Sequence, residues 1–353
     1  MSLSIAQVAP LWENVPPLLY GGTERVIYNL TEGLIKRKHN VTLFACGTSK
    51  TNAKLCSIYP RPLYRDDIPW TNLMYPLLNI TAAFDRANEF DIIHVHLNTM
   101  QDYLALPLAK NISQKVLFTI HFKYPNKNTQ ADRYSVLNKY KELNYSSISN
   151  TQRTGENQQH WLGTVYNGID TTTYTYQAKP KDYFIWLGKF KATKGAYEAI
   201  QAAKQANVKL ILAGTIDKLE KKHYNYYKEK IEPQIDQKQI IYVGEINDQQ
   251  KNDYLGHAIA LLNPIQWNEP FGLVMIEAMA CGTPVIAFRQ GAAAELILDG
   301  QTGYIVDNIG EFIKKIKALN LIKRVNCRQH VEQKFTKEIM TNSYLELYHS
   351  MLK

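Results

Sequence analysis

The sequence lacks the features that would place the chain in a membrane, in a disulfide scaffold or on a secretory route. No apolar run reaches the roughly 20 residues that span a bilayer. The four cysteines are scattered, and none forms the CxxC pair of a zinc knuckle or a redox motif. The opening, MSLSIAQVAPLWENVPP, has neither a basic start nor a long apolar core. We therefore expect a cytoplasmic protein with reduced, structural thiols.

Positive charge is in modest excess. Lysine and arginine number 41 against 32 acidic residues, which gives a net charge of +9. This balance favours phosphates, an anionic membrane or nucleic acid as partners, unless the lysines simply cover solvated faces. The densest basic stretch, residues 218–230 (KLEKKHYNYYKEK), interleaves Tyr and Glu with Lys. We interpret it as a solvated helix and expect no nucleic-acid partner.

The length of 353 residues suggests two domains of roughly 150 residues each. Short β-branched runs alternate with helix-like stretches, which predicts an α/β fold of doubly wound parallel sheets with helices on both faces. The alternation restarts after a polar, proline-containing stretch, so we expect a domain boundary at 168–181. The predicted strands are 3–8, 41–45, 91–96, 115–120, 145–149, 183–187, 208–213, 239–243, 258–263, 284–288 and 303–306. The predicted helices are 23–38, 129–141, 194–206, 218–231, 248–256, 271–281 and 335–352.

A pair of glycines, Gly21 and Gly22, precedes the first predicted helix. Paired glycines let the backbone come close to a ligand, and the N–H groups at a helix start favour phosphate. A simple turn with Thr23 as the N-cap explains the same residues equally well. The GxGxxG fingerprint of dinucleotide binding does not follow the first strand, which weighs against a dehydrogenase.

A basic loop, residues 188–195 (GKFKATKG), follows the first strand of the second half of the chain. Lys189 and Lys194 could bind a diphosphate as compact point charges. A solvated loop is the alternative, and the loop taken alone favours it.

The richest segment is 263–285 (NPIQWNEPFGLVMIEAMACGTPV), which predicts a strand, a loop and a helix. Gly272 at the helix start can present backbone N–H groups to an anion. Glu277 lies in an otherwise apolar helix, where a buried carboxylate is costly unless it is paired or hydrogen-bonded. Ribose hydroxyls would satisfy it, as would a backbone partner or an exposed position.

Three histidines lie on or just after predicted strands. His94 and His96 alternate along one strand and share a face, whereas His121 ends the next strand. We interpret His94 as a packed core residue, leave His96 open, and favour a functional role for His121. The HxH spacing could hold a metal, but no obvious third ligand lies nearby.

Taken in order, these segments resemble the family-4 retaining glycosyltransferases, whose GT-B fold has two Rossmann-like domains facing a central cleft. The resemblance includes DIIHVH, SISNTQR, VYNGID, GKFKATKG, EPFGLVMIEAMACGTPVIAF and DGQTGYIV. Its most specific element is the spacing of seven residues between Glu269 and Glu277. It implies an acceptor-side domain over 1–168, a nucleotide-sugar donor domain over 169–335, and a final helix over 336–353 that crosses back to the first domain.

The resemblance also implies roles for single residues, all of them contacts to a nucleotide-sugar donor. The implied diphosphate contacts are Gly21, Gly22, Lys189 and Lys194. The implied sugar contacts are His121 and Glu269, joined by the amides of Phe271, Gly272 and Leu273, and the implied ribose contact is Glu277. The residues implied to be catalytic are His121, Lys194 and Glu269.

Two positions depart from the usual pattern of the family. Lys189 stands where the family usually has Arg, and a lysine cannot make the same bidentate contact. Residues 291–295 read Gly-Ala-Ala-Ala-Glu where the family usually has Gly-x-x-Pro-Glu. The second change bears on loop shape and on acceptor contacts.

The resemblance implies a retaining transfer, with UDP-glucose or another UDP-hexose as the first candidate donor and GDP-mannose as the second. No Asp-x-Asp metal motif is present, so we expect lysines and helix ends to stabilise the leaving diphosphate without a metal or other cofactor. The departing phosphate would help to take the acceptor proton in a front-side transfer through an oxocarbenium-like state. The alternatives are a nucleotide-sugar epimerase, a sugar phosphorylase, or a non-catalytic nucleotide-sugar-binding protein.

We expect the acceptor to be a saccharide, a lipid or a small molecule, selected by domain-one loops that include 48–80. The charge of +9 permits peripheral contact with an anionic inner membrane face and a lipid-linked acceptor. A soluble saccharide fits as well. The sequence carries no signal for the oligomeric state.

Overall fold

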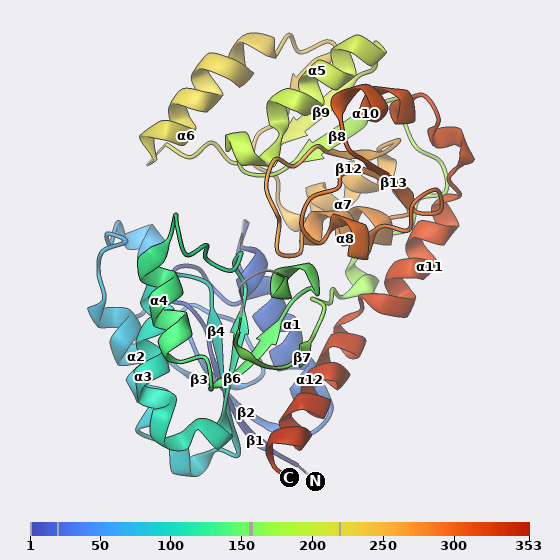
Figure 1. Ribbon diagram of the computed structural model, residues 1–353. Helices are drawn as coiled ribbons and strands as arrows, with labels where there is room; N and C mark the ends of the chain where they lie inside the picture. Colours follow the sequence, from blue (N-terminus) through green and yellow to red (C-terminus); the bar gives the residue numbers. More distant parts are fainter. Residues whose placement is uncertain (1, 20, 155–157, 219) are drawn as a thin grey trace. The chain divides into compact units, whose positions relative to one another are not determined.

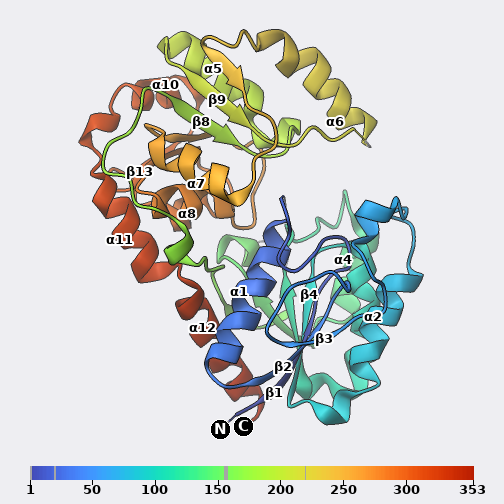
Figure 2. The same ribbon diagram turned by 180° about the vertical axis from the view of Figure 1, so that it is seen from behind.

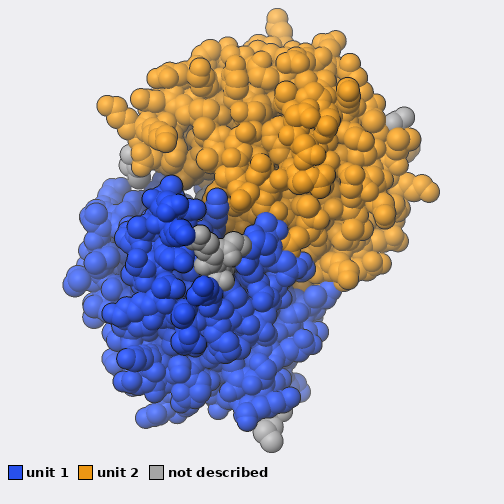
Figure 3. All heavy atoms as spheres, viewed as in Figure 1, with its two compact units in different colours: residues 1–168, 337–353 blue, residues 169–336 orange. Residues whose placement is uncertain are grey.

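The computed structural model describes residues 2–19, 21–154, 158–218 and 220–353. The chain forms two compact units, which Figure 3 colours separately. Unit 1 comprises the chain up to Gly168 together with Lys337–Lys353, and unit 2 comprises Ile169–Thr336. Each unit has its own parallel sheet with helices on both faces, which confirms the predicted α/β class.

Unit 1 is built on a seven-stranded sheet in the order β3-β2-β1-β4-β5-β6-β7, and every described pairing in it is parallel. The order reverses between β1 and β4, so the carboxyl ends of these two strands border a topological switch point, where ligands of such sheets bind. The strands are β1 (Ser4–Val8), β2 (Asn40–Phe44), β3 (Lys54–Cys56), β4 (Ile92–Leu97), β5 (Val116–Ile120), β6 (Asn144–Ser147) and β7 (His160–Thr164).

Helices cover both faces of this sheet. The helices α1 (Gly22–Lys36) and α12 (Lys337–Met351) lie side by side on one face, as Figures 1 and 2 both show. The helices α2 (Met74–Phe84), α3 (Ala105–Ala109) and α4 (Ala131–Lys139) cover the other face. Right-handed crossovers produce this division, because connections that run in opposite directions along the sheet place their helices on opposite faces.

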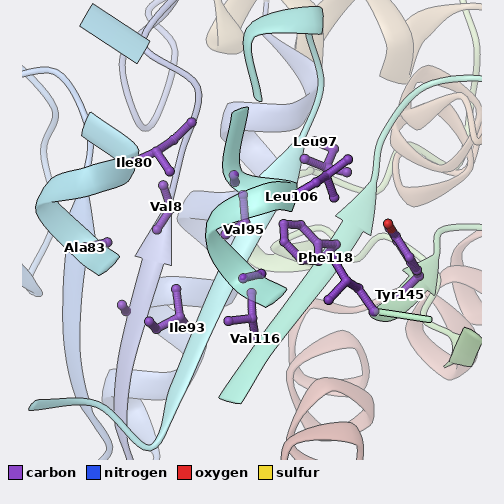
Figure 4. Close-up of a cluster of buried hydrophobic side chains, with 14 of the residues drawn as sticks. Val8, Ile80, Ala83, Ile93, Val95, Leu97, Leu106, Val116, Phe118 and Tyr145 are labelled. Carbon is purple, nitrogen blue, oxygen red and sulfur yellow. The ribbon is translucent and has the colours of Figure 1, made fainter. Parts of the chain in front are cut away.

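The two faces of this sheet differ in chemistry, because successive side chains on a strand point to opposite faces. The face under α2, α3 and α4 is apolar, and Figure 4 shows its buried side chains packed against one another. The labelled members are Val8, Ile80, Ala83, Ile93, Val95, Leu97, Leu106, Val116, Phe118 and Tyr145. The opposite face carries buried polar side chains, among them Gln7, His94 and His96.

The final helix packs closely on α1 at Gly33. A Cβ atom on Gly33 would lie 2.2 Å from Oγ1 of Thr341, so a larger residue would push the two helices apart. Arg37, just after α1, donates to the carbonyl of Glu338 and to the side chain of Asn342. The final helix is therefore part of unit 1, although the chain reaches it only after completing unit 2.

Unit 2 is built on a six-stranded sheet in the order β10-β9-β8-β11-β12-β13. Figure 1 shows α5 and α10 on one face of this sheet and α7 and α8 on the other. The strands are β8 (Phe184–Leu187), β9 (Leu210–Ala213), β10 (Ile240–Tyr242), β11 (Leu261–Asn263), β12 (Val285–Phe288) and β13 (Gly303–Val306). The helices are α5 (Ala196–Ala206), α6 (Lys221–Tyr226, followed by a π-helical turn over Tyr227–Ile231), α7 (Asp248–His257), α8 (Leu273–Ala280), α9 (Ala293–Leu296), α10 (Ile309–Ile316) and α11 (Arg324–Lys334).

Some elements differ from the sequence expectations. Residues 48–80 were expected as loops, and this is wrong, because they contain β3 and the start of α2. The strand β7 (HWLGT) was not predicted, since it has no alternating β-branched pattern and is defined by its pairing with β6. The helix predicted from residue 271 begins at Leu273, because the φ of Gly272 is 94° and ends the loop in the left-handed region. Among the described residues, no helix is long and apolar enough to cross a bilayer.

Candidate active site

The candidate residues of unit 2 follow neighbouring strands. Lys189 and Lys194 come after β8, and Glu269 comes after β11, which is paired with β8. Asp217 comes after β9, on the other side of β8. The carboxyl ends of parallel strands lie at one edge of the sheet, so these charged side chains gather where an α/β sheet binds its ligands.

Lys194 and Glu269 form the centre of this cluster. The Nζ atom of Lys194 makes an ion pair with Oε2 of Glu269. The same oxygen accepts a hydrogen bond of 2.9 Å from Nε1 of Trp267, and Nζ of Lys194 lies 5.2 Å from the centre of the Trp267 ring. The carboxylate is therefore held by two donors, and a ligand that binds Lys194 must share or replace this contact.

The two loops that carry this pair are fastened to each other through their backbones. The amide of Gln266 donates to the carbonyl of Thr193 over 2.8 Å. The φ of Gly195 is 74°, and a Cβ atom on it would lie 2.0 Å from the carbonyl oxygen of Pro264. Only glycine permits this approach without displacing the backbone, so the position of Lys194 relative to Glu269 depends on Gly195.

Lys189 has a different acidic partner. Its Nζ atom lies 2.8 Å from Oδ2 of Asp217, and Nδ1 of His223 lies 3.1 Å from the same oxygen. Burial alone would raise the pKa of Asp217, but the hydrogen bonds from Lys189 and His223 outweigh it and lower the pKa to about 2. Burial and the charge of Lys189 together lower the pKa of Lys191 in the same loop, as expected where lysines crowd together.

The loop that departs from the family pattern supports the backbone of Glu269. The amide of Ala292 donates to the Glu269 carbonyl over 3.0 Å. The φ of Gly291 is 55°, and a Cβ atom on it would lie 2.1 Å from that carbonyl oxygen. The Gly291–Ala292 backbone therefore lies directly against the backbone of Glu269, and this contact does not depend on the side chains that follow in the loop.

The helix α8 begins beside this carboxylate. The Gly272 N-cap is in the left-handed conformation, and none of the described side chains caps the helix, so the amides of Leu273 and its neighbours keep the capacity to bind an anion. The side chain of Phe271 is buried, and its ring packs edge-on against Phe335 at 6.2 Å between centroids. Phe271 thus offers a ligand its backbone rather than its ring.

Glu277 lies on α8 and already has protein partners. Its Oε1 atom accepts from Nζ of Lys251 at 2.7 Å and from Oη of Tyr174 at 2.9 Å. Only 7% of the Glu277 side chain and 12% of the Lys251 side chain is exposed. Tyr174, which we expected in a polar linker, is in fact buried against α8. Partners within the chain therefore stabilise the buried Glu277 carboxylate, and a ribose is not needed for that.

In unit 1, His121 follows β5 and is linked to the buried polar face. Its Nε2 atom lies 2.9 Å from Nδ1 of His96, and Nε2 of His96 lies 2.8 Å from Oε1 of Gln7. Burial lowers the pKa of His121 to about 3 and that of His96 well below its ordinary value. Both rings are neutral at physiological pH.

The backbone around His121 is held by Gln152, a residue of the segment SISNTQR. The Nε2 atom of Gln152 donates to the carbonyls of Ile120 (2.9 Å) and Phe122 (2.6 Å), on either side of His121. The His121 amide donates to the Leu97 carbonyl over 2.8 Å. These bonds fix the end of β5, so the histidine ring projects from a rigid point.

Gly21 and Gly22 begin α1, as the N-cap and the first helical residue. Glu24 lies in the first turn, and a Cβ atom on Gly21 would lie 3.1 Å from one of its carboxylate oxygens. Burial raises the pKa of Glu24 to about 7, although its own backbone amide opposes the shift. This helix start therefore already has a carboxyl group beside it, which a diphosphate at Gly21 would meet.

Of the predicted site residues, the structure brings Lys194 and Glu269 into direct contact, whereas Lys189 pairs with Asp217 and Glu277 with Lys251. Sequence reasoning missed the partner residues. Asp217 could have been found, because it follows a predicted strand by a few residues, whereas Lys251 lies on a polar helix with no local signal. The missed partners are Gln7, Gln152, Tyr174, Asp217, His223, Lys251 and Trp267. Within the described parts of the chain, no group of three His, Cys, Asp or Glu side chains could hold a metal ion.

Comparison with known proteins agrees with this architecture. Residues 20–173 match the model of Glycosyltransferase Family 4, and residues 176–338 match that of Glycosyl transferases group 1. Among solved structures, the sucrose-phosphate synthase of Thermosynechococcus elongatus superposes with a TM-score of 0.80 at 19% identity, over 99% of both chains. HepE of Anabaena, solved in complex with UDP-glucose, superposes with a TM-score of 0.74 at 18% identity, over 99% of this chain and 100% of its own.

Among sequence relatives, the N-acetyl-alpha-D-glucosaminyl L-malate synthase of Bacillus anthracis is 24% identical over 389 residues, which cover 94% of this chain and 95% of that protein. The fold and its solved neighbours define a GT-B glycosyltransferase architecture. The two family matches together extend over nearly the whole chain, and the chain belongs to the group 1 and family-4 glycosyltransferases.

Proposed function

We propose that this protein is a retaining, metal-independent glycosyltransferase that uses a UDP-hexose, most simply UDP-glucose, with GDP-mannose as the second candidate donor. The observation that carries the proposal is the contact of Lys194, Glu269 and Trp267 at adjacent strand ends, in a chain that belongs to a glycosyltransferase family. The complex of Anabaena HepE with UDP-glucose supports the choice of donor.

In this proposal, unit 2 binds the nucleotide and the diphosphate. Lys189 and Lys194 contact the diphosphate, joined by the first amides of α8, because ammonium groups and helix starts both favour an anion. As the anomeric bond breaks, these groups stabilise the charge that develops on the leaving diphosphate, without reorganising. Glu269 holds the sugar hydroxyls, and Glu277 holds the ribose together with Lys251.

Unit 1 contributes His121 as a contact to the transferred sugar, and Gly21 and Gly22 as points of close backbone approach. The acceptor hydroxyl attacks from the side of the departing phosphate, which takes its proton, while the sugar passes through an oxocarbenium-like state. This route retains the anomeric configuration without a protein nucleophile.

Donor binding and its electrostatic basis can be tested by calorimetry with UDP, UDP-glucose and GDP-mannose in buffer containing EDTA. We expect UDP-glucose to bind without metal, and Lys194→Ala to weaken UDP binding about 10-fold or more, the effect of losing a charge-assisted hydrogen bond. The exposed Lys238→Ala is the matched control and should bind UDP as the wild type does. If UDP binds Lys194→Ala unchanged, the assigned site is wrong.

The reaction class can be tested by ¹H NMR on UDP-glucose incubated without acceptor. Slow hydrolysis that first releases α-glucose is the expected result, because water then replaces the acceptor on the retained face. Appearance of a different sugar nucleotide would instead identify an epimerase. Binding with no turnover under any acceptor mixture would indicate a non-catalytic nucleotide-sugar-binding protein.

We further propose peripheral contact of unit 1 with the cytoplasmic face of a membrane, where a lipid-linked acceptor would reside. Large apolar side chains just before α2 and along its first two turns are exposed: Trp70 (52%), Met74 (59%) and Leu78 (53%). Together with a net charge of +9, they suit an anionic bilayer. Co-sedimentation with anionic but not neutral liposomes, reduced in Met74→Ser/Leu78→Ser, is the expected result. Equal sedimentation of wild type and variant would contradict it.

A further inference from the structure

A row of buried polar side chains crosses one face of the unit 1 sheet. Gln7 on β1 is paired in register with His94 on β4, and His96 on β4 is paired with Thr119 on β5, which in turn is paired with Ser146 on β6. All five side chains are fully or almost fully buried. Buried polar groups are costly without partners, so we expect each of these side chains to be hydrogen-bonded.

The helix α12 supplies the outer partners of this row. Oη of Tyr348 lies 2.7 Å from Nδ1 of His94 and 3.1 Å from Nε2 of Gln7. Nε2 of His94 lies 2.7 Å from Oγ1 of Thr119, and Oη of Tyr344 lies 3.1 Å from that same oxygen. Tyr344 and Tyr348 are four residues apart, so both lie on the face of α12 that packs on the sheet.

The bonds of Gln7 set the direction of one branch of this network. The amide nitrogen of Gln7 donates to Tyr348, which leaves its carbonyl oxygen to accept from Nε2 of His96. A neutral imidazole has one donor and one acceptor nitrogen, so Nδ1 of His96 is then the acceptor. Among the described residues, the group that meets Nδ1 of His96 is Nε2 of His121, which must therefore carry the proton.

The consequence for His121 is a single tautomer. With Nε2 protonated and bonded to His96, Nδ1 of His121 carries a lone pair, and it has no hydrogen-bond partner among the described residues. The ring can therefore accept a hydrogen bond from a substrate but cannot donate one at that atom. Because the pKa of His121 is low, the ring stays neutral at physiological pH and Nδ1 keeps its lone pair.

We propose that Gln7 and Tyr348 are positioning residues that, through His96, hold His121 in the Nε2-protonated tautomer, so that its Nδ1 accepts a hydrogen bond from a hydroxyl of the donor sugar. The part that concerns the sugar rests on the proposed function. A donor that presents a carboxylate instead of that hydroxyl would place a lone pair against a lone pair. For a hydroxyl on C6 this change is the one from UDP-glucose to UDP-glucuronic acid, which should then be the poorer donor by about 10-fold or more, the scale of an unpaired buried polar contact.

A role limited to holding α12 on the sheet would need the contacts of Tyr344 and Tyr348 but not the link from Gln7 to His121. Tyr348→Phe removes the acceptor that orients the Gln7 amide and also the contact to His94. Tyr344→Phe removes an equally buried hydroxyl that contacts the network at Thr119 and leaves the Gln7 amide in place. The tautomer of His121 therefore separates the two roles, because only the first variant disturbs the orientation of Gln7. Gln7→Glu keeps an acceptor for His96 in either protonation state, because even a buried, protonated carboxyl group retains a carbonyl oxygen while its O–H group can donate to Tyr348.

The decisive measurement is ¹⁵N NMR of the histidine rings in the full-length protein, with His121 assigned by loss of its signals in His121→Asn. We expect the Nε2-protonated tautomer in the wild type, in Tyr344→Phe and in Gln7→Glu, and a mixture of tautomers in Tyr348→Phe. For catalysis, Tyr348→Phe should lose about 10-fold in kcat/KM, the scale of losing a positioning partner, and Gln7→Glu should retain most of it.

A wild-type His121 protonated on Nδ1, or a tautomer unchanged in Tyr348→Phe, would overturn the proposal. Equal losses of activity in Tyr344→Phe and Tyr348→Phe would also overturn it, since this is the pattern of a structural network. The NMR result needs no nucleotide. If His121 shows the expected tautomer but the protein does not bind UDP, the proposed function is refuted. The assignment of Gln7 and Tyr348 as the residues that set the tautomer would still hold.

Discussion

The two units treat buried polar groups in opposite ways. In unit 1, the strand-end chemistry is a row of neutral side chains in which each hydrogen bond fixes the next, from Tyr348 to His121. In unit 2, the strand ends carry lysine–carboxylate pairs, centred on Lys194 and Glu269. In the absence of a ligand the lysine–carboxylate pairs satisfy one another, whereas the unit 1 row ends in Nδ1 of His121, which has no partner among the described residues. The two arrangements therefore prepare the units for different tasks.

The difference follows from what each kind of contact can exchange. A phosphate presents the same charge to a lysine as a carboxylate does, so a lysine of unit 2 can pass from its acidic partner to a diphosphate with little net loss of electrostatic energy. A neutral hydrogen-bonded row offers no such exchange, but it sets which atom donates and which accepts. Unit 2 is thus suited to hold charge, and unit 1 to discriminate by hydrogen-bond direction.

The largest expected effect is that of Glu269→Ala on catalysis. The change removes the group assigned to the sugar hydroxyls and leaves Lys194 without its carboxylate. We expect turnover of UDP-glucose to fall about 10²–10³-fold, the usual cost of losing one positioned polar group at a reaction centre. Glu229→Ala, at an exposed position of the same unit, serves as the control and should leave turnover unchanged. Wild-type turnover in Glu269→Ala would show that the strand-end pair of unit 2 does not take part in the reaction.

The next effect is on the stability of unit 2, through the pair of Lys251 and Glu277. Lys251→Met leaves a nearly buried carboxylate without its charge partner, and we expect a loss of about 3 kcal/mol in the free energy of unfolding. Adding Glu277→Leu should recover part of the loss, because the unpaired charge is then gone. Urea unfolding of the wild type and of these two variants measures both changes. Lys228→Met, which breaks an exposed pair with Glu232, should have little measurable effect.

A smaller effect is expected at the glycine that joins the two unit 2 loops. Gly195 and Gly300 both have φ of 74°, but a Cβ atom on Gly195 would meet the Pro264 backbone, whereas one on Gly300 would meet nothing within 4 Å. Gly300→Ala should cost about 1 kcal/mol from the left-handed conformation alone. Gly195→Ala should cost about 2–3 kcal/mol, since overpacking is added to it. Equal losses would show that the loops are not fastened at this point.

The sequence was sufficient for features that depend on local pattern. The strand–helix alternation predicted the parallel sheets, and the segment from Asn263 to Val285 predicted β11, its loop and α8 within two residues of the helix start. The end of an apolar run is a local signal of a strand end, which is why His121 could be selected as a candidate. Glu269 was selected from the resemblance, through its spacing to Glu277.

Partners could not be predicted, because they depend on tertiary packing. Glu277 was interpreted as a carboxylate in need of a ligand, since nothing in its helix reveals that Lys251 and Tyr174 approach it from elsewhere in the chain. Gln7 lies within an apolar strand, and its importance appears only when register places it beside His94. A sequence shows which buried group needs a partner but not which residue provides it.

The contrast between the units is sharpest for two buried carboxyl groups with opposite pKa shifts. Burial raises the pKa of Glu24 in unit 1 from 4.5 to about 7, so the folded state binds the proton more tightly and wild-type stability falls as the pH rises from about 4.5 to about 7. In unit 2, burial of Asp217 is outweighed by Lys189 and His223, which lower its pKa from 3.8 to about 2. That stabilisation is present above about pH 3.8 and is lost as the pH falls towards 2.

Glu24→Gln and Asp217→Asn should therefore change stability in opposite directions at pH 8. Glu24→Gln should stabilise the protein by about 1–2 kcal/mol, less than the full shift implies, because the amide still bears a cost of burial. Asp217→Asn should destabilise it by about 1–2 kcal/mol. Thermal unfolding from pH 8 to pH 4 should show the Glu24→Gln gain vanish while most of the Asp217→Asn loss persists, because pH 4 lies below the unfolded-state pKa of only the first group. Parallel pH profiles for the two variants would mean that the units do not differ in how they carry buried charge.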